Sequence, residues 1–104
     1  LQLSAIDSFS VLVSWRPPLE PNGIIVSYRL LYNGNLSQPD DLWTNLSHDG
    51  SFTSTEVLGL MSGTRYYFKI GACTEVGVGP FSPVKDVHTP PQKYGQLQVN
   101  EKSC

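Results

Sequence analysis

Apolar and polar residues alternate along three stretches of this chain, and a period of two residues is the pattern of half-buried β-strands. In each stretch one face carries β-branched and aromatic side chains, which fit a pleated and partly buried surface. The side chains that the pattern assigns to the core are Phe9, Val11, Val13 and Trp15 in the first stretch, Val26, Tyr28, Leu30 and Tyr32 in the second, and Tyr66, Phe68, Ile70 and Ala72 in the third. Leu12, Leu31 and Tyr67 fall on the predicted outer faces, and the pattern leaves the side of Ile25 open.

Turn-forming segments rich in Gly, Pro and Asn separate these stretches from shorter ones, because these residues supply the backbone angles that tight turns need. Further strands are expected at residues 1–6, 42–46, 53–58 and 84–89. No window of helical length carries a sustained apolar stripe at the α-helical period. Seven short strands separated by turns predict an all-β fold, a seven-stranded immunoglobulin-like β-sandwich.

Composition and charge exclude several classes of protein. A chain of 104 residues with 39% apolar and 15% charged residues is long enough for one globular domain and too short for two. The net charge of -2 supplies no basic field for nucleic acid. The longest aliphatic run, residues 24–26, cannot cross a bilayer. Since the chain begins with leucine, we expect it to be a piece of a larger protein, with any signal or anchor outside it.

The residues form no catalytic, cofactor or metal constellation. His48 and His88 are isolated, and the pair Asp40-Asp41 lacks the alternating spacing of a calcium loop. Gly77 and Gly79 are not followed by the lysine and helix of a phosphate loop. We therefore predict that the chain is not an enzyme and binds no cofactor.

Residues 1–90 resemble a fibronectin type III domain. The features that carry the resemblance are, in chain order, Trp15 followed by Pro17-Pro18, Asn22-Gly23 leading to Tyr28, Leu30 and Tyr32, the stretch from Gly59 to Ala72 with Ser62 at the usual proline position, Gly79-Pro80-Phe81-Ser82, and Thr89-Pro90. The resemblance implies two sheets with strands A-B-E and C′-C-F-G. The spacing of Leu60 and Gly63 before Tyr66 also predicts a tyrosine corner. An immunoglobulin domain is disfavoured, because strand B carries Val11 and Val13 instead of a cysteine and no tryptophan separates Cys73 from Cys104.

The resemblance implies a spacer and protein-interaction module whose contacts use loops held by the sandwich. The implied structural residues are Trp15, Tyr28, Leu60, Tyr66, Phe68 and Ile70, and the candidate interaction loops comprise Glu20, Pro21, Asn22 and Gly23 between strands B and C, and Glu75, Val76, Gly77, Val78, Gly79 and Pro80 between strands F and G. Neither the Arg-Gly-Asp motif of integrin binding nor the Trp-Ser-x-Trp-Ser motif of cytokine receptors occurs. Expected partners are matrix or cell-surface proteins and neighbouring repeats, with neither nucleic acid nor membrane insertion.

Two sequons for N-linked glycosylation, at Asn35 and Asn45, agree with an extracellular location. Cys73 is expected to point outward on strand F, and we predict that it forms no disulfide with Cys104. The alternative is a structural repeat of an intracellular, sarcomeric-type array, in which the sequons stay unused and the thiols reduced.

Residues 91–104 are expected to form a linker and the start of a following repeat. Leu97-Gln98-Val99 is similar to Leu1-Gln2-Leu3 at an offset of 96 residues, and similarity at a fixed period is the signature of repeat arrays. The suggested parent is a large cell-surface or extracellular protein of the usherin or receptor-type tyrosine phosphatase kind.

Overall fold

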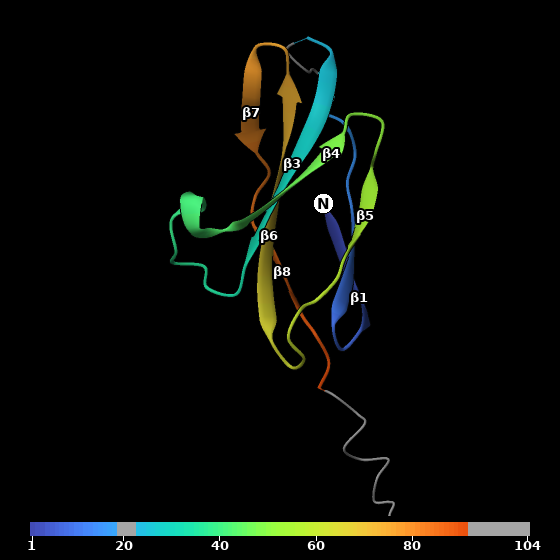
Figure 1. Cartoon of the computed structure of the whole chain (residues 1–104), viewed down its shortest axis with the longest axis vertical. Coiled ribbons are helices and arrows are strands. Elements are labelled where there is room, and N and C mark those ends of the chain that lie inside the picture. The colour runs from blue at the N-terminus through green and yellow to red at the C-terminus, as the bar shows by residue number, and fades with distance from the viewer. Residues whose placement is uncertain (19–22, 92–104) are drawn as a thin grey trace, which may run out of the picture.

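The computed structural model describes residues 1–18 and 23–91 of the chain, and it shows two antiparallel sheets packed face to face (Figure 1). One sheet has the strand order β1-β2-β5, and the other has the order β4-β3-β6-β7, with β8 also paired to β6. The bounds are β1 Gln2–Asp7, β2 Ser10–Ser14, β3 Ile25–Asn33, β4 Thr44–Asp49, β5 Ser54–Val57, β6 Arg65–Thr74, β7 Gly77–Phe81 and β8 Lys85–His88, with a 3-10 turn η1 at Asp40–Leu42. These are the A-B-E and C′-C-F-G sheets, so the β-sandwich expected from the sequence is confirmed.

The buried residues of both sheets form one core between them. Trp15, Tyr28, Leu60, Tyr66, Phe68 and Ile70 all belong to it, together with Val11, Val13, Leu30 and Val57. The rings of Trp15 and Tyr28 lie 5.3 Å apart, centroid to centroid. The hydroxyl of Tyr66 accepts a hydrogen bond from the backbone N–H of Met61 at 2.9 Å, which is the geometry of a tyrosine corner.

The strand predicted from the first alternating stretch, β2, begins at Ser10, one residue later than its apolar pattern suggests. Phe9 was assigned to the core, but it lies in the turn between β1 and β2 and is 45% exposed. The carboxylate of Asp7 accepts hydrogen bonds from the Phe9 N–H and the Ser10 hydroxyl, each at 2.8 Å. The alternation fails at Phe9 because these local bonds turn the backbone there.

A β-bulge overturns the core assignment of Val26 and settles the side of Ile25, which the pattern left open. Val26 was assigned to the core, yet it is 52% exposed, whereas Ile25 packs against the core. The register of β3 against β6 shifts between Ile25 and Ser27, so Val26 is the extra residue of the bulge. The N–H of Gly50 donates to the Val26 carbonyl at 3.1 Å, and a Cβ at position 50 would collide with the Ile25 carbonyl. Only glycine allows this approach.

The expected last strand, G, is divided into two strands, β7 and β8. They pair with the two halves of β6, which is strand F. Ser82 joins the halves: its N–H donates to the Ile70 carbonyl at 2.8 Å, and its hydroxyl accepts from the Ile70 N–H at 3.1 Å. Pro83 follows, and its missing N–H ends the regular ladder. Strand β7 pairs with the end of β6, so it contains four residues that were expected in the F–G loop: Gly77, Val78, Gly79 and Pro80.

Hydrogen bonds fix the backbone where the described residues end. Thr89 is fully buried; its N–H donates to the Thr64 carbonyl at 2.9 Å and its hydroxyl to the Met61 carbonyl at 2.7 Å. The Gly63 N–H donates to the Pro90 carbonyl at 3.0 Å. The Ser8 hydroxyl donates to the carbonyl of Pro91 at 3.1 Å. The chain is thus held at the pole opposite the β6–β7 hairpin (Figure 1).

Candidate interaction surfaces

The β6–β7 hairpin and the start of β3 form one pole of the sandwich (Figure 1). The hairpin turn is the pair Glu75 and Val76, held by a hydrogen bond from the Val76 N–H to the Thr74 hydroxyl at 3.2 Å. A Cβ on Gly23 would lie 3.1 Å from the Glu75 carboxylate, so the B–C connection reaches the hairpin. The structure therefore brings together Gly23, Glu75 and Val76, whereas Glu20, Pro21 and Asn22 lie outside the described residues.

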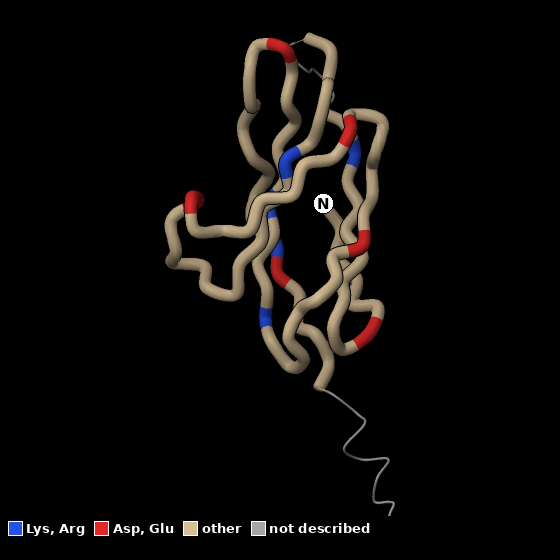
Figure 2. Tube along the Cα trace, viewed as in Figure 1, with Lys and Arg blue, Asp and Glu red and all other residues tan. Residues whose placement is uncertain are grey.

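This pole, which we call the hairpin pole, exposes aliphatic side chains. Val76 is 83% exposed at the hairpin tip, and the others are Ile24, Val26 and Val78. Charges are spread thinly over the described part of the chain, with basic and acidic residues interspersed along the backbone (Figure 2). The charged residue of the hairpin turn is Glu75. Contact at this pole would accordingly depend on apolar area more than on charge.

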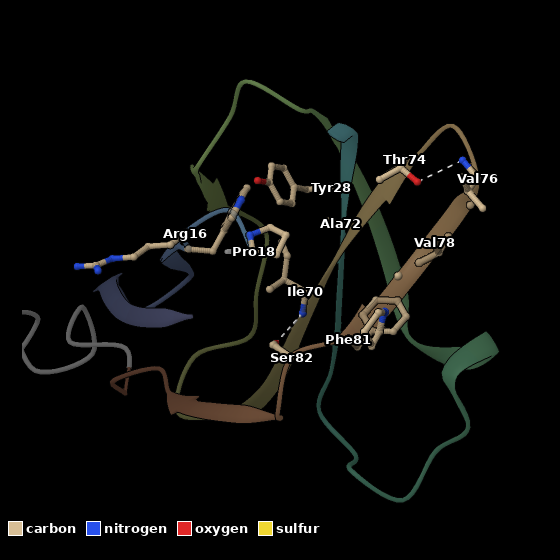
Figure 3. A pocket seen from close by; sticks show the side chains of 14 residues that line it. Arg16, Pro18, Tyr28, Ile70, Ala72, Thr74, Val76, Val78, Phe81 and Ser82 are labelled. Carbon is tan, nitrogen blue, oxygen red and sulfur yellow. Dashed lines mark hydrogen bonds between the residues drawn. The ribbon is translucent and has the colours of Figure 1, made fainter. Parts of the chain in front are cut away.

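A groove of about 550 Å³ opens beside the hairpin pole, between the end of β2 and the inner face of β7. Figure 3 shows side chains of the groove from the segment that follows β2 and from β3, β6 and β7 of the five-stranded sheet. The lining includes Trp15, Arg16, Pro18, Tyr28, Ile70 and Ala72. Most of this lining is apolar. The sequence analysis did not predict the groove, because it arises where two segments far apart in the chain come together.

The hydroxyl of Tyr28 is directed toward Arg16 and Pro18 in this groove (Figure 3). Tyr28 is 2% exposed, and its hydroxyl has no hydrogen-bond partner among the described residues. Burial raises the pKa of this hydroxyl, because the phenolate loses its hydration there. A buried hydroxyl without a hydrogen-bond partner costs free energy in the folded chain.

The outer face of the five-stranded sheet holds a cation between two aromatic rings. The ammonium of Lys69 on β6 lies 5.0 Å from the centre of the Trp43 ring and 5.2 Å from that of Phe81, and it pairs with the Asp40 carboxylate at 2.5 Å. The indole N–H of Trp43 donates to the Gln38 carbonyl at 2.9 Å. We call these residues the lysine stack. It fastens the segment between β3 and β4 to the sheet.

Sequence reasoning missed the lysine stack, because the Asp40-Asp41 pair near Trp43 was considered only as a candidate calcium loop. Leu31, predicted on the outer face, does lie there but is almost fully buried. A Cβ on Gly71 would lie 3.0 Å from the Phe81 ring, so this ring lies directly over the glycine.

The two sequon asparagines both lie on the surface. Asn35 lies in the loop after β3, where its side-chain oxygen accepts hydrogen bonds from the Ser37 N–H at 3.1 Å and the Ser37 hydroxyl at 2.7 Å. Asn45 lies on β4 opposite Leu31. Both residues are exposed. Glycans at either position would project into solvent.

Cys73 is buried on β6, and no disulfide partner for it lies among the described residues; Cys104 lies outside them. Within residues 1–18 and 23–91, no three of the side chains His, Cys, Asp and Glu gather as they would around a metal ion. No helix in that part of the chain has the length and apolar composition needed to span a membrane.

Comparisons with known proteins agree with this fold. The family model described as fibronectin type III domain matches residues 1–87. Mouse receptor-type tyrosine-protein phosphatase F is 33% identical over 106 residues, covering 99% of this chain and 6% of that protein. Human netrin receptor DCC is 41% identical over 73 residues, covering 70% of this chain and 5% of that protein. The chain thus spans only a small fraction of the length of either receptor.

A solved structure supports the same conclusion about the fold. The fn3 domain of human contactin 1 superposes with a TM-score of 0.76 at 23% sequence identity, covering 88% of this chain and 74% of that one. At this identity the likeness concerns the fold, which is the sandwich described above.

Proposed function

The chain belongs to the fibronectin type III family, and from that premise we propose that it is a non-catalytic module of a multidomain extracellular protein, where it spaces its neighbours and binds partner proteins. The relatives named as receptors support the extracellular location. The observation that carries the binding role is the hairpin pole, where exposed aliphatic side chains adjoin a mostly apolar groove. Exposed apolar patches of this kind mark protein contacts more often than other surface does.

The spacer role is supported by the two poles of the sandwich. The described residues end with Pro90 and Pro91, whose carbonyls accept hydrogen bonds from the Gly63 N–H and the Ser8 hydroxyl respectively, at the pole opposite the hairpin. Because the backbone is fixed there, it sets the direction in which the following residues leave the sandwich. We propose that residues 1–90 are the domain and residues 91–104 the linker and start of a following repeat. In a polypeptide extended by one more domain, residues 97–104 should gain amide-exchange protection; fast exchange there would contradict the repeat.

The binding role is tested by displaying the chain in multivalent form on beads and measuring cell binding by flow cytometry. Val76→Asp places a charge in the hairpin pole, and Leu58→Asp is the matched control, because Leu58 is 66% exposed outside the hairpin pole. We expect Val76→Asp to weaken binding by about tenfold or more, the effect of losing one contact worth ~1.4 kcal/mol. Both variants should keep the melting temperature of the parent chain. Loss of binding in Leu58→Asp alone would show that a different surface binds.

A further inference from the structure

Three of the four sheet edges in the described sandwich carry features that discourage pairing with another chain. β1 has a register irregularity between Ala5 and Asp7, and β5 has only four residues. The edge formed by β7 and β8 contains Pro80 and is broken at Ser82. Bulges, short strands and prolines are the usual devices that keep open strand edges from aggregating.

The remaining edge, β4, has none of these devices. Its six residues pair with β3 in continuous register, with no irregularity from Thr44 to Asp49. It contains neither lysine nor proline, and its single acidic residue, Asp49, is the last of the strand. Alternate backbone N–H and C=O groups of β4 point away from β3, as on any edge strand, and can pair with a second strand.

The sequon Asn45-Leu46-Ser47 lies on this unprotected strand. Leu46 packs against the core, so Asn45 and Ser47 are on the opposite, solvent-facing side of the sheet. Asn45 is exposed and follows the first residue of β4. A bulky, hydrated group attached here would stand beside the open edge without disturbing the core.

We propose that an N-linked oligosaccharide on Asn45 protects the β4 edge from pairing with a second copy of this chain. The proposal rests on the extracellular location proposed above, since the modification occurs in the secretory pathway. The side-chain nitrogen Nδ2 forms a bond to the anomeric carbon of a lipid-linked oligosaccharide. The bond from that carbon to the lipid diphosphate breaks, and Nδ2 gives up one proton. The glycan then takes the role that an edge lysine has in other sheets.

The test is to secrete the 104-residue chain from mammalian cells behind an added signal peptide and to measure intact mass and sedimentation. Because the signal peptide is supplied, the outcome does not depend on where the natural protein resides. Asn45→Gln should lose one glycan mass and raise the weight-average mass roughly twofold at high concentration, as strand pairing of two copies does. Asn35→Gln is the matched control: it removes the other sequon and should stay monomeric.

Asn45→Lys separates edge protection from other effects of the glycan, because it introduces a charge at the edge without any sugar. It should be monomeric like the parent chain. If Asn45→Gln does not fold, trimming the glycan of the folded parent to a single sugar should produce the same self-association. An unmodified Asn45 would overturn the proposal. So would a monomeric Asn45→Gln chain, or an Asn45→Lys chain that self-associates as strongly as Asn45→Gln.

Discussion

Removing one hydroxyl from each of two buried tyrosines should lower stability at one site and not at the other. Tyr66 and Tyr28 both lie in the core, and the change to phenylalanine removes the same atom from each. The Tyr66 hydroxyl accepts the Met61 N–H at 2.9 Å, whereas the Tyr28 hydroxyl has no partner among the described residues. The difference between the two variants therefore measures the tyrosine corner with ring volume held constant.

Tyr66→Phe leaves the Met61 N–H without its partner in a partly buried turn, at a cost of about 1–3 kcal/mol. For a domain of this size each kcal/mol lowers the melting temperature by roughly 4–8 °C. Tyr28→Phe relieves an unpaired buried hydroxyl, so we expect stability equal to that of the parent chain or higher. Urea denaturation followed by tryptophan fluorescence measures both changes in free energy of unfolding.

The pH dependence gives a second readout for Tyr28. Burial raises the pKa of Tyr28 in the folded chain, because folding disfavours the phenolate. The free energy of unfolding is therefore unaffected by this group below pH ~10, and it falls as pH rises through the folded pKa. Tyr28→Phe should remove that alkaline loss. The reasoning fails if Tyr28→Phe destabilises the chain as much as Tyr66→Phe does.

Further predictions concern the core, the lysine stack, the acidic turns and the thiol. Trp15→Ala should cost ~3–5 kcal/mol by leaving a cavity between the sheets, and an unchanged melting curve would contradict its central position. Lys69→Met should speed amide exchange in residues 38–43, because the ion pair and the cation–π contacts are lost; unchanged exchange would show that the stack does not hold this segment. The pKa of Asp7 is lowered by hydrogen bonds from Phe9 and Ser10, and that of Asp49 by hydrogen bonds from Ser51. The stability that these two carboxylates contribute is present above pH ~4 and is lost as pH falls through the folded pKa. Asp7→Asn should flatten this acid dependence in denaturation experiments between neutral and acidic pH. Thiol titration of unreduced monomer should find Cys73 free, and a monomer with no free thiol would disprove this.

The alternation of residues was sufficient to predict the fold class, because each sheet has one face in the core and one in solvent. Val11, Val13, Leu30, Phe68 and Ile70 are buried where the period of two places them. The same pattern failed where local geometry interrupts the strand. The Asp7 side chain turns the backbone before Phe9, and the bulge exposes Val26. A period of two contains no information about an inserted residue, so these exceptions could not be predicted from it.

The features of the candidate surfaces were likewise predictable from the sequence only in part. The sequence by itself determined the sandwich, the core tryptophan and tyrosines, the sequons and the hairpin that carries Val76, because each depends on residues close together in the chain or on a periodic pattern. Only the tertiary structure decided that Lys69 lies between Trp43 and Phe81 and that a groove opens between β2 and β7. It also decided that β4 is an open edge, since strand order is set by which elements pair across the sheets. Contacts between distant segments follow from that pairing, and no local pattern encodes it.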